Sequence, residues 1–272
     1  MSSAARKRVI LVGVGGATCS GKTTLAKHLR RCLPNSIIIH QDVRRKLYRE
    51  FDLETKLYDV KGLCAELIPI HPEYGVQDWD DPTGAIDWPR MRKFLREVKQ
   101  TGMVPDWHKS HDHLNEQKNI PVNEATFSRW KDKFELLSKQ FEERGDTVIW
   151  GLVDGFLLYW DEEVIDLLDA RMFLRVSYNV LKQRRYERHG YHTAVQSDPE
   201  GALWRDPPNY FDQIVYPAYI RAHTRMFVDG DIEKGAPSDF VKGLLLIDSE
   251  KLGMDEIFEK SAELLWEVSK LE

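Results

Sequence analysis

Cysteine is scarce in this chain. Its three cysteines, Cys19, Cys32 and Cys64, are an odd number and lack metal-binding spacing, so we expect free thiols in a reducing compartment. Long apolar runs are missing too, because no segment approaches the roughly 20 apolar residues of a transmembrane helix. The basic residues at 6–8 precede an apolar stretch, but glycines interrupt it too early for a signal sequence. We therefore expect a cytoplasmic protein.

An excess of positive charge is also absent. The 272 residues include 39 Lys and Arg against 44 Asp and Glu, a net charge of −5, whereas nucleic-acid-binding domains are usually basic. Internal repeats and low-complexity segments are not evident, and the length suits one α/β core with insertions. We expect a single domain over residues 1–272 that binds neither nucleic acid nor membrane; its oligomeric state is left open.

What the chain does contain is a glycine-rich loop between a predicted strand and a predicted helix. The apolar residues 9–12 lead into Gly16-Ala17-Thr18-Cys19-Ser20-Gly21-Lys22-Thr23, and Thr24 opens a helix-compatible segment that reaches residue 30. This is the strand, loop and helix arrangement of a phosphate-binding P-loop. A dinucleotide-binding fingerprint is excluded because Thr18 stands where its third glycine belongs.

Each residue type in this loop suits a nucleoside triphosphate. Gly16 and Gly21 let the backbone approach the phosphates and direct N–H groups at them, and the start of the helix adds the positive end of a dipole. Lys22 supplies a mobile charge for the β- and γ-phosphates, and Thr23 supplies a hydroxyl ligand for Mg²⁺. The sequence thus predicts a triphosphate bound with magnesium.

Apolar runs alternate with amphipathic segments along the rest of the chain. Buried strands are predicted at residues 37–39, 147–153, 171–176 and 243–247. Helices are predicted at residues 88–99, 127–143 and 255–268. Strands that alternate with helices indicate a three-layer α/β/α fold with a mostly parallel sheet. Three irregular excursions are expected at about residues 53–82, 103–126 and 184–206.

Two carboxylates follow predicted strands, at the sheet edge where α/β proteins bind ligands. Asp154 ends the hydrophobic strand at 147–153, which is the Walker B pattern of a residue that holds Mg²⁺ through its water shell. Asp42 follows the strand at 37–39, where a carboxylate can take the proton from an attacking hydroxyl. For Asp42, position alone leaves open a solvated turn or a helix N-cap.

Two further segments have both a structural and a functional interpretation. Residues 182–189 are rich in arginine and fit either an exposed charged helix face or a lid whose arginines neutralise charge during phosphoryl transfer; we favour the lid. Trp79 and Asp80 alone indicate an exposed turn, although an aromatic plane beside a carboxylate also suits a flat base and a ribose.

Together these residues resemble the nicotinamide riboside kinases, a branch of the P-loop nucleoside kinases related to uridine kinase. The resemblance covers most of the chain and rests on the P-loop at 16–23, Gln41-Asp42, Gln77-Asp78-Trp79-Asp80, Val153-Asp154-Gly155-Phe156, the lid at 182–188 and Asp206-Pro207-Pro208-Asn209-Tyr210-Phe211-Asp212. The last motif, followed by Tyr216 and Tyr219, is the most specific. The resemblance implies that ATP phosphorylates the 5′-hydroxyl of nicotinamide riboside, giving nicotinamide mononucleotide for NAD salvage.

On the donor side, the resemblance implies roles for catalytic and ATP-binding residues. Asp42 corresponds to the general base, which also helps Thr23 and Asp154 to organise Mg²⁺, while Lys22 and Arg184 correspond to residues that stabilise the transferring group. Contacts to ATP are implied for the P-loop from Gly16 to Thr24, for Arg184 and Arg188 in the lid, and for Lys251, Leu252 and Gly253.

On the acceptor side, the resemblance implies that Trp79 and Tyr191 sandwich the pyridine ring and that Asp80 and Arg185 hold the ribose hydroxyls, with Asp42 close to the 5′-hydroxyl. A cationic pyridinium favours electron-rich aromatic faces. A carboxylate and a guanidinium can bond to adjacent hydroxyls in pairs. These physical preferences agree with the implied roles.

The chain departs from the family pattern in two motifs. Asp42 is followed by Val43-Arg44-Arg45, where family members commonly have a second acid and aromatics, and Asp154 stands where many relatives have Glu. The core motifs do not account for residues 103–123. The histidines there, His108, His111 and His113, lack Cys or carboxylate partners at zinc-site spacing, so we interpret them as part of a polar surface loop.

Two other activities stay open at this point. A uridine or cytidine kinase, or another small-molecule P-loop kinase, would differ in its preferred acceptor. A nucleotide-driven switch or ATPase would hydrolyse the triphosphate without an added nucleoside. The residues also leave open whether nicotinic acid riboside is accepted and whether ATP or GTP is the donor.

Overall fold

Five parallel strands form the central sheet. The computed structural model describes residues 6–41, 68–105, 115, 118–188, 190–193 and 202–270, and the structural statements below concern those residues. In spatial order the strands are β2 (Ser36–His40), β3 (Asp146–Gly155), β1 (Arg6–Gly16), β4 (Ala170–Arg175) and β7 (Leu244–Asp248). Each neighbouring pair is parallel, so all five carboxyl ends meet at one edge.

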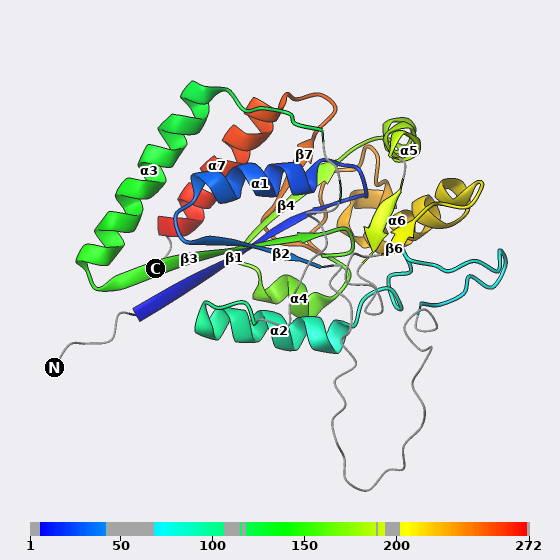
Figure 1. Ribbon diagram of the computed structural model, residues 1–272, viewed down its shortest axis with the longest axis horizontal. Coiled ribbons are helices and arrows are strands. Elements are labelled where there is room, and N and C mark those ends of the chain that lie inside the picture. Colours follow the sequence, from blue (N-terminus) through cyan, green and yellow to red (C-terminus); the bar gives the residue numbers. More distant parts are fainter. Residues whose placement is uncertain are drawn as a thin grey trace, which may run out of the picture.

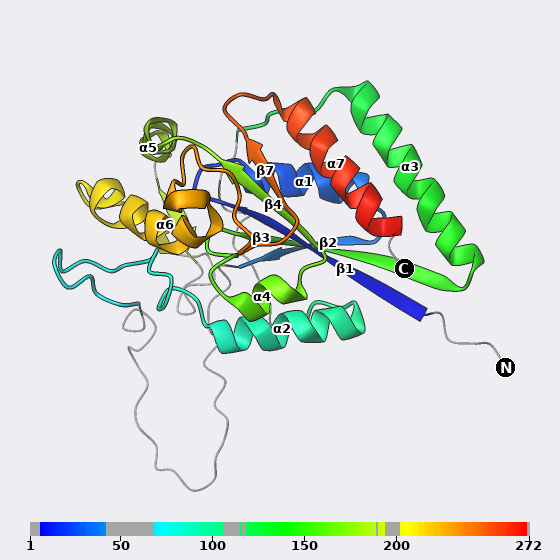
Figure 2. The same ribbon diagram turned by 180° about the vertical axis from the view of Figure 1, so that it is seen from behind.

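Helices cover both faces of this sheet (Figure 1; Figure 2). One face carries α1 (Lys22–Cys32), α3 (Glu124–Glu143) and α7 (Met254–Lys270). The other face carries α2 (Trp88–Thr101) and α4 (Glu162–Leu167). This arrangement confirms the predicted three-layer α/β/α fold. None of the helices in the described ranges has both the length and the apolar character needed to cross a membrane.

The remaining elements gather beyond the carboxyl ends of the strands, where Figure 1 shows α5, α6 and β6. They are α5 (Tyr178–Glu187), β5 (Tyr191–Thr193), β6 (Ala202–Trp204), the π-helix η2 (Phe211–Val215), α6 (Tyr216–His223) and the 3₁₀ turns η3 (Thr224–Met226) and η4 (Val228–Gly230). The strands β5 and β6 form a separate antiparallel hairpin. These elements lie where an α/β sheet places its ligand site.

Strand β1 has a nearly continuous apolar sequence because it is covered on both faces. Val9 and Leu11 pack into the core that includes α2, whereas Ile10, Val12 and Val14 pack into the core that includes α1 and α7. Successive side chains of a strand point to opposite faces. One strand therefore contributes to both cores and connects the two helical layers.

The strands and helices predicted from apolar periodicity are confirmed, with ends that differ by up to four residues. Helices α4, α6 and η2 had no recognisable pattern in the sequence. The six residues of α4 are too few to display a helical period. The first residues of the predicted lid, 184–187, belong to α5 and are helical.

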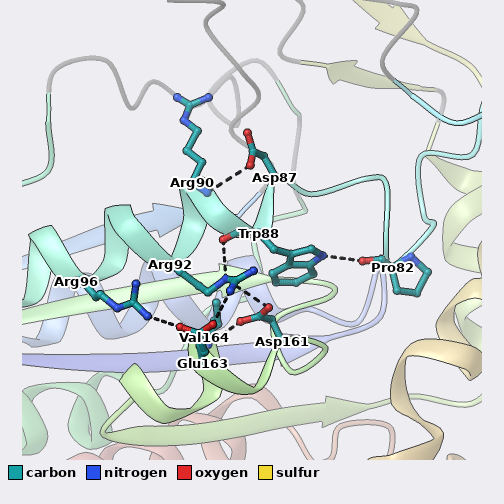
Figure 3. Close-up of polar contacts among 9 residues, drawn as sticks. All are labelled: Pro82, Asp87, Trp88, Arg90, Arg92, Arg96, Asp161, Glu163 and Val164. Atoms are coloured by element: carbon teal, nitrogen blue, oxygen red, sulfur yellow. Dashed lines mark hydrogen bonds and ion pairs between the residues drawn. The ribbon is translucent and has the colours of Figure 1, made fainter.

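Polar contacts fix helix α2 beside α4 (Figure 3). Asp87 caps α2 by accepting a bond from the Arg90 amide (3.3 Å), and Arg92 pairs with Asp161 and Glu163 of the α4 start. The Trp88 indole N–H donates to Pro82 O (2.8 Å). Because Trp88 is buried, this bond holds the end of the segment that carries Trp79 and Asp80.

Candidate active site

The P-loop joins β1 to α1 with two glycines in the left-handed region. Gly16 has φ 149° and Gly21 has φ 96°, and a Cβ on Gly16 would lie 2.7 Å from Leu174 O. Gly21 is the N-cap of α1 and has no side chain to cap the helix, so the first amide groups of α1 stay available to an anion. Lys22 Nζ donates to Ala17 O (3.3 Å) within the same loop.

Asp154 lies at the end of β3, beside the start of α1. Its Oδ2 accepts a bond from Thr23 Oγ1 (2.7 Å) and lies 3.2 Å from His40 Nδ1. Burial by itself raises the pKa of Asp154, but the bonds from His40 and Thr23 and the charge of Lys22 outweigh it, so the pKa lies below its usual value. The carboxylate is therefore held in its charged form.

These residues fit a magnesium ion. Asp154 Oδ1 is buried and has no hydrogen-bond partner among the described residues, so one carboxylate oxygen is available to a cation or its water. The same part of the chain contains no group of three or more His, Cys, Asp or Glu placed to hold a metal. Protein Mg²⁺ sites commonly use one or two carboxylates, with phosphates and water as the other ligands.

Gln41 fixes the point where β2 ends. Its backbone N–H donates to Asp154 O (2.8 Å), and its side-chain Oε1 accepts a bond from the Leu157 backbone N–H (2.9 Å). Gln41 is buried, so these two bonds fix the last described residue of this part of the chain. Asp42 itself lies outside the described residues, as do Val43-Arg44-Arg45 and the histidines at 108, 111 and 113.

The segment that carries Trp79 and Asp80 is held by residues far away in the sequence. The Tyr210 hydroxyl donates to Gln77 O (2.7 Å) and accepts a bond from the Trp79 amide (3.1 Å). Arg221 of α6 pairs with Asp81 (2.9 Å). The motif around Tyr210 thus positions the predicted nucleoside-binding residues through their backbone.

Asp80 is a buried carboxylate, with 8% of its surface exposed. Burial raises its pKa to about 6, although the charge of Arg185 acts in the opposite direction. The neighbouring carboxylates of Asp78 and Asp206 also act to raise the pKa, and their effect is included in that value. Near neutral pH this carboxylate is therefore mostly charged, and it suits hydroxyl donors.

Two arginines of α5 reach the P-loop. Arg184 Nη1 donates to Cys19 O (3.2 Å), and Arg185 Nη1 donates to Thr18 Oγ1 (3.0 Å). The other nitrogens of Arg185, Nε and Nη2, donate to the two oxygens of Asp206 at 2.6 and 2.9 Å. Arg188 is the C-cap of α5. Tyr191 begins β5, and its side chain lies outside what the structure describes.

The last group of implied ATP contacts, residues 251–253, forms the turn between β7 and α7. Lys251 pairs with Asp248 (3.1 Å), the Gly253 amide donates to Glu256 Oε2 (3.0 Å), and Leu252 packs against the core that includes α1 and α7. The turn follows a strand parallel to the rest of the sheet. It therefore lies at the same sheet edge as the P-loop.

One pocket connects the P-loop to the acceptor side. Its walls include Ala17 and Thr18 of the P-loop, the carboxylate-bearing Asp80 and the aromatic residues Phe156 and Tyr219. Apolar walls with a few polar groups are typical of small-molecule sites. Donor-side and acceptor-side residues thus face the same space.

Sequence comparison identifies the family. The chain is 30% identical over 228 residues to a nicotinamide riboside kinase of Saccharomyces cerevisiae, covering 84% of this chain and 82% of the relative. The chain belongs to the nicotinamide riboside kinase family. A family member from Eremothecium gossypii is 31% identical (82% of this chain, 80% of the relative), and nicotinamide riboside kinase 2 of Homo sapiens is 28% identical (81% and 70%). No protein-family model matches the chain. Membership in this family makes the chain an enzyme, a kinase.

Four residues with clear contacts in this family member received no role from the sequence. His40 bonds to the Walker B carboxylate, and Asp206 pairs with Arg185, while Trp204 and Tyr210 contact the Trp79 segment. Asp206 and Tyr210 belong to the most family-specific motif, so the sequence indicated that they matter but did not indicate what they do. His40 and Trp204 had no such signal, because their partners are distant in the sequence.

Proposed function

We propose that this kinase transfers the γ-phosphate of ATP to the 5′-hydroxyl of nicotinamide riboside, giving nicotinamide mononucleotide for NAD biosynthesis. Family membership supports this reaction. The observation that carries it is the shared pocket, in which Ala17 and Thr18 of the P-loop and the buried carboxylate of Asp80 line one space. A donor and an acceptor bound to these residues would meet there.

For the donor, we propose that the P-loop amides from Gly16 to Thr24 and the Lys22 ammonium bind the phosphates, while Thr23 and Asp154 hold Mg²⁺. The metal, when bound, neutralises charge on the phosphate oxygens. Arg184 bonds to the loop at Cys19, a position from which its charge can stabilise the transferring group. Arg188 and the turn with Lys251, Leu252 and Gly253 are proposed as further ATP contacts.

For proton transfer, we propose Asp42 as the general base and as a third contributor to the magnesium site. Support comes from Gln41, whose bonds to the Asp154 and Leu157 backbones fix the chain directly before Asp42. A base must lie within hydrogen-bond reach of the hydroxyl that it deprotonates. A rigid strand end is a suitable support for that requirement.

For the acceptor, we propose that Trp79 and Tyr191 bind the pyridinium ring and that Asp80 and Arg185 bind the ribose. A pyridinium cation is attracted to an aromatic face. Asp80 accepts hydroxyl bonds in its charged form, and Asp206 holds Arg185 by two bonds. The acceptor is thus a small molecule; a cytoplasmic location and a single domain over residues 1–272 belong to the same proposal.

The test is ATP consumption by the purified chain with Mg²⁺ and different nucleosides. We expect rapid turnover with nicotinamide riboside, slow turnover with uridine and cytidine, and little consumption without a nucleoside. Equal or faster turnover of uridine would assign the chain to the pyrimidine nucleoside kinases. Hydrolysis that ignores added nucleoside would indicate a switch or an ATPase. Nicotinic acid riboside and GTP are included to define the acceptor and donor ranges.

A further inference from the structure

Trp204, the last residue of the β6 strand, packs against the proposed nucleoside-binding segment. Its ring lies 5.4 Å from the Trp79 ring at 60° and 5.7 Å from the Tyr210 ring at 61°. The preceding residue, Leu203, is 48% exposed, which shows that β6 turns Trp204 inward and Leu203 outward. Edge-to-face aromatic pairs at such distances are favourable and depend on orientation.

The same indole is bonded to the partner of the lid arginine. Trp204 Nε1 donates to Asp206 Oδ1 (2.9 Å), and this oxygen also accepts Arg185 Nη2 (2.9 Å). Arg185 is 7% exposed and continues to Thr18 of the P-loop (3.0 Å). Contacts therefore run without interruption from Trp79 through Trp204, Asp206 and Arg185 to the P-loop.

The segment that Trp204 contacts has little regular structure to hold it. Between residues 68 and 87 the structure contains a single isolated bridge, Ile70 to Gln77, and no helix or strand. Tyr210 fixes the backbone of Trp79, and Trp204 of the hairpin contacts its ring. The orientation of the Trp79 ring thus depends on side chains from the 204–210 segment.

We infer that Trp204 and Asp206 are positioning residues that couple the nucleoside-binding aromatic residue, Trp79, to the lid arginine, Arg185. Trp204 orients the ring of Trp79, and Asp206 holds Arg185 and the Trp204 indole on one carboxylate. This inference rests on the proposed function, in which Trp79 and Arg185 contact the nucleoside. It predicts that both residues determine nucleoside affinity while leaving ATP affinity nearly unchanged.

The first experiment measures KM for nicotinamide riboside and for ATP in Trp204→Leu and Trp204→Phe. We expect Trp204→Leu to raise KM for the nucleoside about tenfold and Trp204→Phe, which keeps an aromatic ring, about threefold, because an aromatic pair of this kind contributes about a factor of 2 to 12. KM for ATP should change less than about twofold in both variants, because neither removes a group assigned to ATP.

Trp266→Phe is the matched control. Trp266 also makes edge-to-face contacts, with Trp130 at 6.5 Å and Phe134 at 5.9 Å, but it belongs to the core that includes α1 and α7. It should leave both KM values unchanged. Equal increases of both KM values in Trp204→Leu, or no increase in a folded variant, would overturn the inference.

Asp206→Asn tests the coupling, since the amide keeps the shape of the carboxylate but cannot accept both bonds from Arg185. Combined with Trp204→Phe, it should raise KM for the nucleoside by less than the product of the two single effects, because both single changes disturb the same bonds. Effects that multiply would show that the two residues act independently, and would contradict the coupling.

Hydrogen exchange separates this inference from the proposed function. In Trp204→Leu without any ligand, amides at residues 77–80 should exchange faster than in the unmodified chain, whereas Trp266→Phe should not alter them. If the unmodified chain does not phosphorylate nicotinamide riboside, the proposed function fails while this measurement still decides the packing role. Unchanged exchange at residues 77–80 in Trp204→Leu would overturn the inference that Trp204 positions this segment.

Discussion

The two sides of the site are built in different ways. On the donor side, backbone ladders set the positions: β1 pairs Val14 with Asp154, and β2 pairs His40 with the same residue. On the acceptor side, side chains set the positions, since Trp79 is held by Tyr210 and Trp204. The sheet thus positions the proposed donor-side residues, whereas side-chain contacts position the proposed acceptor-side residues.

This difference predicts two classes of variant. A change on the donor side should slow transfer to every acceptor, because it removes stabilisation of the transferring phosphoryl group. A change on the acceptor side should alter the affinity for one nucleoside and leave the donor alone. A donor-side variant that altered the affinity for only one nucleoside, or an acceptor-side variant that slowed transfer to every acceptor, would show that the two sides are not separate.

The largest effect is expected for Lys22→Ala. Loss of one charged group that stabilises a transition state costs about 10²- to 10³-fold in kcat, and Lys22 is the ammonium group at the start of α1, bonded to Ala17 O. The loss should be the same with each nucleoside that the enzyme accepts. Arg30→Ala, an exposed change in the last turn of the same helix, is the control. Retention of kcat within about threefold would contradict the assigned role.

The next effect concerns magnesium and His40. His40→Leu removes the bond to Asp154 Oδ2, and loss of such an orienting partner typically weakens metal binding by about 10- to 100-fold. We expect a higher Mg²⁺ concentration for half-maximal rate and weaker Mg²⁺ binding by the ADP complex in a fluorescence titration. His40→Asn, which keeps an N–H at a similar place, should recover part of the affinity. Equal Mg²⁺ dependence in the Leu and Asn variants would argue against orientation by this bond.

How much of this arrangement the sequence predicts depends on the sequence distance between partners. The P-loop is contiguous, and the roles predicted for its glycines, Lys22 and Thr23 follow from their spacing. Apolar runs likewise predict the sheet, because a strand buried on both faces needs apolar residues at nearly every position. The parallel order of the sheet follows from the alternation of strands and helices.

The acceptor side could not be predicted from spacing. Trp79 and Asp80 alone indicate an exposed turn, and their assignment came from the family resemblance. In the structure Asp80 is buried, and Arg185 pairs with Asp206, 21 residues away. Such contacts depend on how α5, β6 and the 68–87 segment fold together. No local pattern in the sequence encodes that packing.

Titration of Asp80 should distinguish the two sides by pH. Its pKa is about 6, and the protonated form cannot accept two hydroxyl bonds as the carboxylate does. Nucleoside affinity should therefore be constant above pH 7 and fall about tenfold by pH 5, whereas nucleotide affinity over the same range should change less. Isothermal titration calorimetry, in which nucleoside or nucleotide is added to the ligand-free protein at each pH, measures both affinities.

The control for this titration is Asp80→Asn, which should bind nucleoside weakly at every pH. Other charged groups near Asp80 are Asp78, Asp206, Arg185 and Lys22. If Asp80→Asn retains the loss of affinity below pH 6, a group other than Asp80 is responsible. That outcome would contradict the role of Asp80 as the titrating acceptor of the ribose hydroxyls.

The smallest effects come from one matched pair of Tyr→Phe changes, with one member on each side. Tyr159 is fully buried, and its hydroxyl lies 2.9 Å from Met172 O and 3.1 Å from Gly13 O in the sheet, whereas the Tyr210 hydroxyl joins Gln77 to Trp79. Each loss of a hydroxyl should cost about 1 kcal/mol. For Tyr159→Phe this should appear as a Tm lower by about 2–4 °C, with KM for the nucleoside unchanged.

For Tyr210→Phe the loss should appear as a KM for the nucleoside raised by about fivefold. The change in Tm should be smaller, because the segment that this variant releases can move without unfolding the sheet. If both variants lowered Tm equally and left KM unchanged, the acceptor segment would fold as one unit with the sheet. The two sides would then differ only in how far apart in the sequence their contacting residues lie.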